Sequence, residues 1–216
     1  MRINKYLALK KISTRRGADE LVETKKIFIN GKLAVLGSQV NEGDIVEVKG
    51  VKTKEYKYFA YNKPVGVETN SPREDLFPLG RLDKNSCGLL ILTNDGRITD
   101  QLLNPKYFHE KEYVVKTSNK LRSSFKKKME AGVNIEGYMT KPCKVKILNE
   151  NTFRIILTEG KKHQIRRMCS ALFQEIADLK RERIMNIKLG NLKSNSLREI
   201  KGEELAVFLK SLSLTN

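Results

Sequence analysis

The chain has 216 residues, 39% of them apolar, which is enough for one substantial core and a small second domain. Its 42 Lys and Arg against 25 Asp and Glu give a net charge of +17, more than solubility requires, so the expected partner is a polyanion: RNA, DNA or an anionic membrane. Apolar runs stay far below the ~20 residues of a membrane span, and the first residues do not read as a signal peptide. We therefore expect a cytoplasmic protein that does not contact membranes.

The cysteines are Cys87, Cys143 and Cys169, an odd number at wide spacings. They form no Cys-x-x-Cys pair, and the chain has only two histidines. We expect three free thiols, with neither a disulfide framework nor a metal site.

Residues 1–48 predict a small unit of two helices followed by strands. Apolar residues recur at near-helical spacing up to Ile12, and Ser13 is the predicted N-cap of a second helix. The period then changes: 27–29 predicts a strand that ends in an Asn30-Gly31 hairpin turn, and 44–48 alternates as a second strand.

The lysine-rich segment 49–57 is the predicted linker, because it can bury little and its like charges favour extension. Residues 58–216 then form one larger domain. Its predicted strands are 58–61, 89–92, 113–115 and 153–157, and its predicted helices are 121–131, ended by Gly132, and 163–173, entered through Gly160.

The motif Gly80-Arg81-Leu82-Asp83 is followed by the apolar strand 89–92 and an Asn94-Asp95-Gly96 turn. A lone aspartate is most often a turn residue or a solvated charge. Here the carboxylate sits beside a fixed cation and ahead of a buried strand, which predicts a rigid active-site loop at the mouth of a cleft.

Three further segments of the chain carry motifs. Together with this loop they occur along the sequence in the same order as in a known family. They are Asn62-Lys63-Pro64, Lys111-Glu112-Tyr113 and the decapeptide 159–168, Glu-Gly-Lys-Lys-His-Gln-Ile-Arg-Arg-Met. With the loop, they resemble the RNA pseudouridine synthases of the RsuA/RluB/RluE/RluF group. Segments 164–169 and 183–186 look most like the RluF branch, whereas Lys84-Asn85-Ser86-Cys87 is an unusual version of the segment after the aspartate.

The first domain carries a second resemblance. Residues 2–7, Ser13-Thr14-Arg15-Arg16 and Asn30-Gly31 are similar to the S4 RNA-binding domain, with Thr14 as an insertion-like departure. The two resemblances together imply an α+β protein. A small S4-like domain precedes a pseudouridine synthase domain with a mixed, mainly antiparallel sheet flanked by helices.

The resemblance implies that Asp83 is the nucleophile. It attacks the target uridine so that the N1–C1′ bond breaks, the uracil turns while held, and C5 joins C1′. Whether attack falls first on the ribose or on the base stays open. No atoms are lost or gained, so the expected reaction needs no cofactor, metal or redox partner.

A carboxylate nucleophile must stay ionised while the bound substrate excludes water, and this needs a nearby cation. By resemblance that cation is Arg166; the alternative is a basic helix face on RNA, which is the expected role of Arg167. Tyr113 matches the family's tyrosine, which stacks on the target base and whose hydroxyl is a candidate for assisting proton removal at C5. The alternative is a core tyrosine on an alternating strand.

Other residues are expected to contact RNA. Arg81 either fills the space that the extruded uridine leaves or contacts a phosphate, and Lys63 either touches phosphate or braces the site. His163 is expected to orient a neighbour or contact RNA rather than act as an acid or base, and Cys87 is expected to pack. The full set of predicted RNA contacts is Arg81, Lys63, Arg167, His163, Arg2, Lys5, Arg15 and Arg16.

The sequence thus predicts a monomeric enzyme that converts uridine to pseudouridine in ribosomal RNA, 23S by its RluF-like features, with tRNA as a possible second substrate. An RsuA-like enzyme for 16S RNA is the first alternative. A non-catalytic S4-type ribosome assembly factor is the second, and the set of Asp83, Tyr113 and Arg166 argues against it. A DNA glycosylase is disfavoured by the S4-like domain.

Overall fold

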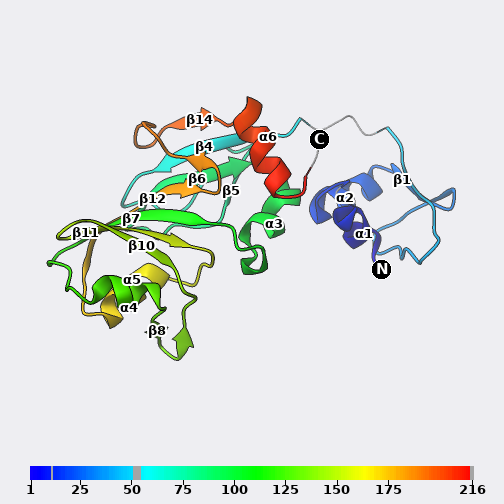
Figure 1. The fold of residues 1–216 in the computed structure, drawn as a ribbon. Coiled ribbons are helices and arrows are strands. Elements are labelled where there is room, and N and C mark those ends of the chain that lie inside the picture. Colours follow the sequence, from blue (N-terminus) through cyan, green and yellow to red (C-terminus); the bar gives the residue numbers. More distant parts are fainter. Residues whose placement is uncertain (11, 51–54, 215–216) are drawn as a thin grey trace. The chain divides into compact units, whose positions relative to one another are not determined.

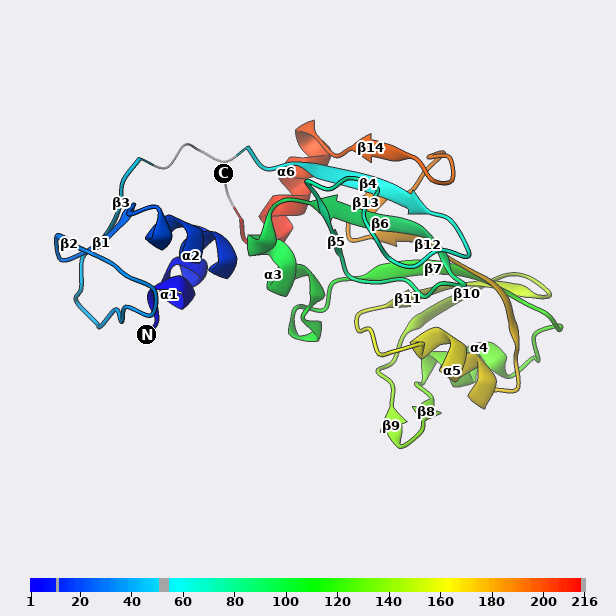
Figure 2. The same cartoon turned by 180° about the vertical axis from the view of Figure 1, so that it is seen from behind.

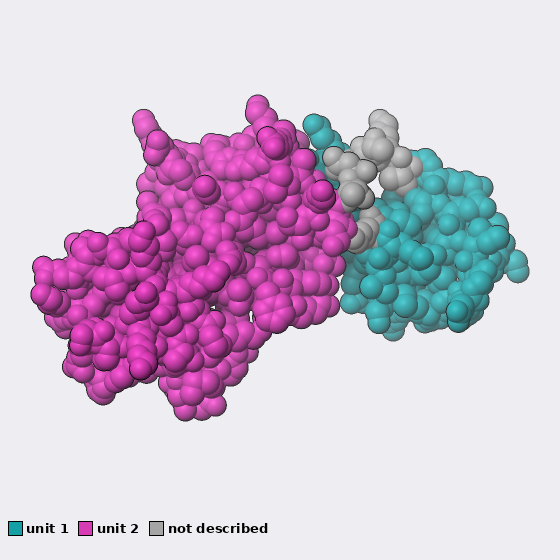
Figure 3. All heavy atoms as spheres, in the orientation of Figure 1, with its two compact units in different colours: residues 1–56, 95–99 teal, residues 57–94, 100–216 magenta. Residues whose placement is uncertain are grey.

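The computed structural model describes residues 1–10, 12–50 and 55–214 (Figure 1 and, from behind, Figure 2). The chain divides into two compact units, residues 1–56 with 95–99 and residues 57–94 with 100–216 (Figure 3). Four residues of the predicted linker, 51–54, lie outside the described part. Within the described part, no helix is long and apolar enough to cross a bilayer.

Unit 1 contains the predicted helix pair and strands. Its elements are α1 (Ile3–Leu9), α2 (Arg15–Glu23), β1 (Ile27–Ile29), β2 (Lys32–Leu33) and β3 (Val46–Val48). The strands form an antiparallel sheet in the order β2-β1-β3. The hairpin between β1 and β2 turns at Asn30 (φ 50°) and Gly31 (φ 75°), as the Asn-Gly pair predicted.

The N-cap of α2 is Thr14, one residue later than predicted. Its hydroxyl accepts a hydrogen bond from the Gly17 amide at 3.0 Å. The helix begins at Arg15, so this amide is the third of the helix and lies within reach of residue 14 rather than Ser13. The residue that interrupts the S4-like motif is therefore the one that starts the helix.

The core of unit 1 forms where both helices meet the sheet, and it includes Leu7, Ala18 and Ile27. The basic side chains on the helices face outward instead. The four predicted RNA contacts of this unit are all exposed: Arg2, Lys5, Arg15 and Arg16.

Unit 2 is built on one mixed sheet of nine strands. Its main path runs β10 (Lys144–Asn149), β11 (Thr152–Leu157), β7 (Lys111–Thr117), β12 (Ile176–Ile184), β6 (Cys87–Thr93), β4 (Tyr58–Lys63) and β14 (Leu197–Glu199). Beside this path, β5 (Phe77–Leu79) pairs with β6, and β13 (Ile187–Lys188) pairs with β12. Among the described strands, β12 and β6 pair in parallel and the other neighbours are antiparallel. This is the mainly antiparallel α+β arrangement that the sequence predicted.

Helices cover this sheet, and short elements connect it. They are α3 (Thr99–Leu103), η2 (Pro105–Tyr107), α4 (Phe125–Glu130), β8 (Asn134–Ile135), β9 (Tyr138–Met139), α5 (Gln164–Ala171) and α6 (Gly202–Ser211), whereas η1 (Gly96–Ile98) belongs to the segment 95–99 of unit 1. One core lies where α4 and α5 meet β7 and β11, and in it the rings of Phe125 and Phe153 pack edge to face at 4.9 Å. This core fixes α5, which carries the predicted Arg166, against the sheet.

Two predicted features differ in detail from the structure. Helices α4 and α5 are shorter than the predicted 121–131 and 163–173. The predicted Asn94-Asp95-Gly96 turn leads directly into a 3-10 helix: the Asp95 carboxylate accepts from the Arg97 amide at 3.1 Å and caps η1. An aspartate ahead of a glycine suits a turn or a helix start, and here the chain leaves β6 through a helix.

Candidate active site

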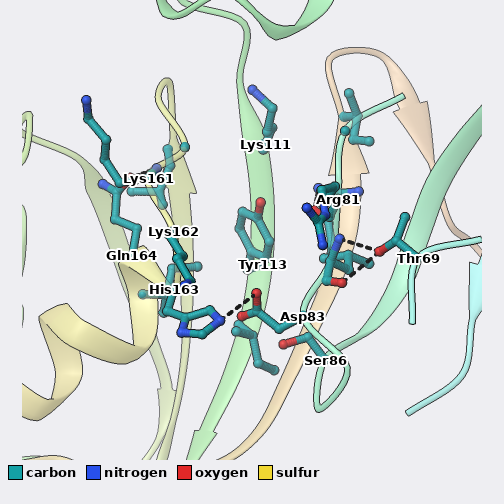
Figure 4. A pocket seen from close by; sticks show the side chains of 18 of the residues that line it. Thr69, Arg81, Asp83, Ser86, Lys111, Tyr113, Lys161, Lys162, His163 and Gln164 are labelled. Carbon is teal, nitrogen blue, oxygen red and sulfur yellow. Dashed lines mark hydrogen bonds and ion pairs between the residues drawn. The ribbon is translucent and has the colours of Figure 1, made fainter. Parts of the chain in front are cut away.

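A cleft of about 620 Å³ opens in unit 2, and three of the four predicted motif segments line it; Asn62-Lys63-Pro64 does not. Its wall includes the loop from Leu79 to Lys84, the start of β7, the segment 159–165 and part of β12. In Figure 4, Tyr113 stands between Lys111 and Asp83, with His163 on one side and Arg81 on the other. The folded chain therefore brings together residues that are widely separated in sequence.

The loop that carries Asp83 is held by side chain and backbone hydrogen bonds. The Thr69 hydroxyl donates to the Leu82 carbonyl at 2.7 Å and accepts from the Leu82 amide at 2.9 Å. The Ser86 amide donates to the Asp83 carbonyl at 2.9 Å. These bonds fix the backbone on both sides of Asp83, whose carboxylate stays accessible from the cleft.

Gly88 allows β6 to approach β12. It has φ 104°, and a Cβ built there would lie 2.3 Å from the Arg181 carbonyl oxygen. Only glycine fits both this conformation and this spacing. Gly88 is thus needed for the parallel pair of β6 and β12.

Two side chains from the segment 159–168 reach the Asp83 carboxylate. Arg166 Nε lies 3.7 Å from Asp83 Oδ2, and His163 Nε2 lies 3.4 Å from Oδ1. Arg166 Nη2 also donates to the Asn85 carbonyl at 2.7 Å and the Ser86 hydroxyl at 3.0 Å. Arg166, the predicted cation, thus lies next to Asp83, the predicted nucleophile. His163 lies close enough to orient the Asp83 carboxylate.

Tyr113 lies on β7 and lines the cleft. It is opposite Arg181 in the antiparallel pairing of β7 with β12, and its ring is half-buried beside Asp83 (Figure 4). One face of a ring in this position is available to a flat ligand that enters the cleft.

Glu159 connects the start of α5 to the end of β9. Its carboxylate is buried and accepts from the Tyr138 hydroxyl at 2.7 Å, the Lys141 amide at 3.0 Å and the Gln164 side chain at 2.7 Å. Burial opposes ionisation, but these hydrogen bonds outweigh it and hold the Glu159 pKa below its ordinary value. Glu159 therefore holds the start of α5 in place, a role that the motif 159–168 did not indicate.

The other predicted contacts divide into exposed and internally paired residues. Arg81 is exposed at the cleft. Lys63 is fully buried, and its ammonium donates to the carbonyls of Pro64 at 2.8 Å and Val67 at 2.7 Å. Of its two predicted roles, this arrangement favours the brace over the phosphate contact.

Arg167 also uses its charge within the protein. Its Nη2 donates to Glu136 Oε2 at 2.7 Å and to the Ile135 carbonyl at 3.1 Å. This arrangement favours a structural role over the predicted RNA contact, because the Arg167 guanidinium already binds a carboxylate and a backbone carbonyl. Cys87 is half-buried, and burial raises the pKa of its thiol, which fits the predicted packing role.

The sequence motifs assigned no role to several polar residues of the cleft, among them Thr69, Ser86, Lys111 and Arg181. A signal existed for Lys111, since residues two apart on a strand share a face and Lys111 precedes Tyr113 by two. Arg181 lies in a run of charged residues that gave no strand signal.

Comparisons with known proteins agree with this fold. A solved structure described as a pseudouridylate synthase superimposes with a TM-score of 0.71 and 26% identity, over 98% of this chain and 99% of that one. The RNA pseudouridylate synthase family model matches residues 57–171, and the S4 domain model matches residues 1–46. The fold is therefore that of an RNA-modifying isomerase with an S4 domain. The chain belongs to the RNA pseudouridylate synthase family.

Named relatives cover nearly the whole chain. The dual-specificity RNA pseudouridine synthase RluF of Escherichia coli (strain K12) is 38% identical over 97% of this chain and 79% of its own length. The protein of the same name in Salmonella typhi is 40% identical over 97% and 78%. The ribosomal large subunit pseudouridine synthase B of Bacillus subtilis (strain 168) is 33% identical over 94% and 93%.

Proposed function

We propose that this enzyme converts a uridine of large-subunit (23S) ribosomal RNA into pseudouridine, with Asp83 as nucleophile. The observation that carries the proposal is the accessible Asp83 carboxylate, 3.7 Å from Arg166 Nε, in a cleft that Tyr113 also lines. A fixed guanidinium favours the ionised carboxylate when substrate excludes water. The large-subunit substrate is supported by the name of the Bacillus subtilis relative, and a second substrate by the dual specificity named for the others.

The target base must leave its stack to reach this cleft. We propose that the uracil lies against the Tyr113 ring, with its C1′ directed at Asp83. Arg81, exposed at the cleft, then either fills the space that the base leaves or holds a neighbouring phosphate.

The reaction rearranges bonds within one nucleotide. An Asp83 oxygen attacks, the N1–C1′ bond breaks with its electrons moving to the base, and the uracil turns so that C5 faces C1′. The C5–C1′ bond then forms, the bond between the Asp83 oxygen and the nucleotide breaks with its electrons returning to the carboxylate, the C5 proton leaves and N1 gains a proton. Arg166 and His163 hold the carboxylate in place for attack and for departure.

Unit 1 is proposed to supply affinity. Arg2, the N-cap of α1, and the side chains of Lys5 on α1 and of Arg15 and Arg16 on α2 are exposed and can neutralise phosphates. The chemistry is then confined to unit 2.

The test uses transcripts of 23S RNA, 16S RNA and tRNA with labelled uridine, in single turnover with enzyme in excess. We expect pseudouridine in a 23S fragment from the wild-type enzyme and none from Asp83→Asn. The amide keeps the shape of the side chain but removes its negative charge, so RNA affinity should equal that of the wild type or exceed it slightly.

A binding isotherm for each protein separates chemistry from affinity. Turnover by carefully purified Asp83→Asn, or a loss of turnover fully explained by weaker binding, would rule out Asp83 as the nucleophile. Product only in 16S RNA would replace the large-subunit substrate with the small-subunit one.

A further inference from the structure

Two cations in the cleft have no part in the chemistry described so far. Lys111 on β7 and Arg181 on β12 both line it, on neighbouring strands. Neither forms an ion pair with any residue that the structure describes. Lys111 is partly buried and Arg181 is buried, and a buried positive charge without a counter-ion is costly, so a ligand that supplies electron density would stabilise them.

Arg181 is the more buried of the two, with 3% of its surface exposed. Nε donates to the Leu89 carbonyl at 2.7 Å, and Nη1 lies 3.5 Å from the Arg81 carbonyl. Nη2 is buried and has no partner among the described residues. The guanidinium carbon is 6.0 Å from the centroid of the Tyr113 ring. The Arg181 guanidinium is thus held in place beside Tyr113, and its Nη2 group remains able to donate hydrogen bonds.

Lys111 shares the cleft face of β7 with Tyr113 (Figure 4). Burial and the charge of Arg181 lower the pKa of its ammonium. The carboxylates nearest in sequence, Glu110 and Glu112, are engaged by Arg183, at 2.9 and 2.7 Å. They therefore do not neutralise the two cleft cations.

We propose that Arg181 and Lys111 bind a carbonyl oxygen of the target uracil and stabilise the negative charge that it gains during the reaction. This inference rests on the proposed function. The polar edge of a uracil stacked on Tyr113 would lie near the Arg181 guanidinium. Its carbonyl oxygen could then accept a hydrogen bond from Arg181 Nη2, which has no partner among the described residues.

A phosphate is the less suitable occupant. The backbone of an extruded nucleotide stays at the mouth of the cleft, where Arg81, Lys161 and Lys162 are exposed to receive it. The buried Arg181 is suited to the part of the nucleotide that enters deepest, which is the base.

The order of attack does not affect this role. If Asp83 attacks C1′, the electrons of the N1–C1′ bond pass to the uracil and spread onto its carbonyl oxygens. If Asp83 adds to the ring, the electrons of the C5–C6 bond pass to O4. In both cases fixed cations at a carbonyl oxygen stabilise charge that is larger in the transition state than in the substrate.

The test combines protein and substrate changes. Single-turnover rates are measured for wild type, Arg181→Met and Lys111→Met on RNA with uridine, 2-thiouridine or 4-thiouridine at the target. Removing a donor to a developing oxyanion typically costs ~10²–10³ in rate. Sulfur accepts hydrogen bonds poorly, so we expect the thio substitution at the contacted oxygen to slow the wild type and to have little further effect in the variant.

Arg183→Met is the matched control, because Arg183 lies on the same strand and is satisfied by carboxylates. In this variant the thio effects should equal those of the wild type. If Arg181→Met fails to fold, Arg181→Lys and Lys111→Met carry the same test.

Additive effects at both oxygens, or unchanged rates in the variants, would overturn the inference. The same holds if coupling is found with phosphorothioates next to the target instead, since the occupant would then be a phosphate. Failure of the wild type to form pseudouridine in any RNA would instead refute the proposed function.

Discussion

Two neighbours of the Asp83 carboxylate differ in how firmly they are held. The Arg166 side chain is 27% exposed and is tied to Asn85 and Ser86, whereas the His163 side chain is 50% exposed. An exposed pair is worth little, and a fixed, partly buried charge is worth more. The two residues should therefore contribute unequally to catalysis.

We expect Arg166→Met to lower the single-turnover rate by about 100-fold or more, because the carboxylate loses its fixed counter-charge and its loop loses two hydrogen bonds. His163→Ala should cost less than about 10-fold. Rates on the same RNA at saturating enzyme check this order. A larger loss for His163→Ala than for Arg166→Met would contradict it.

At the scale of single elements, glycine sets the approach of β6 to β12. We expect Gly88→Ala to lower the free energy of unfolding by at least about 2 kcal/mol, since a Cβ would strain a positive φ and meet the Arg181 backbone. Gly66→Ala is the control: it has φ 86° but no atom within 4 Å of the built Cβ. Urea unfolding should show a clearly smaller cost for Gly66→Ala, and equal costs would contradict the steric argument.

The Glu159 carboxylate links the end of β9 to α5 and gives a pH-dependent contribution. Its folded pKa lies below the ordinary value of 4.5, so its stabilisation is fully present above that value and is lost as the pH falls through the folded pKa. Glu159→Gln should lower stability by about 1–3 kcal/mol at neutral pH, because one donor loses its acceptor. The difference from wild type should shrink below pH 4.5, as measured by thermal unfolding across pH; a constant difference would contradict it.

The helices and strands that could be predicted are those whose apolar residues form a run or recur at a regular spacing. Strands β4, β6, β7 and β11 read as apolar or alternating runs and are present, and the motif residues Asp83, Tyr113 and Arg166 meet as expected. Strand β12 was missed because its centre, residues 180–183, is charged throughout. Of these residues, Arg181 lines the cleft, Arg183 binds Glu112 of β7 and Glu182 binds Arg154 of β11, which is tertiary information that no local pattern contains.

At the scale of the whole molecule, the charge of +17 predicts that RNA binding is chiefly phosphate neutralisation. If about five phosphates are contacted, the slope of log affinity against log salt should be roughly −3.5 to −4.5. Filter-binding isotherms from low to high salt measure it. A slope near zero would mean that the basic surface serves another purpose.

The same measurement on a chain that starts at Lys57 tests the division of labour between the units. Unit 2 contains its own core, so this chain should fold and keep partial activity at high enzyme concentration. It should lose most activity on dilute RNA and show a shallower salt slope. Wild-type activity at limiting enzyme and RNA would argue against a separate binding role for unit 1.

The place of β12 in the sheet has a consequence for biosynthesis. This strand, formed by residues 176–184, is inserted between β6 and β7, which are made long before it. Until β12 emerges from the ribosome, no strand lies between β7, which carries Tyr113, and β6, which follows Asp83. The parallel pair of β12 and β6 therefore cannot form. The nascent chain can therefore assemble its S4 domain early but not its catalytic cleft, so it remains inactive during most of its own translation.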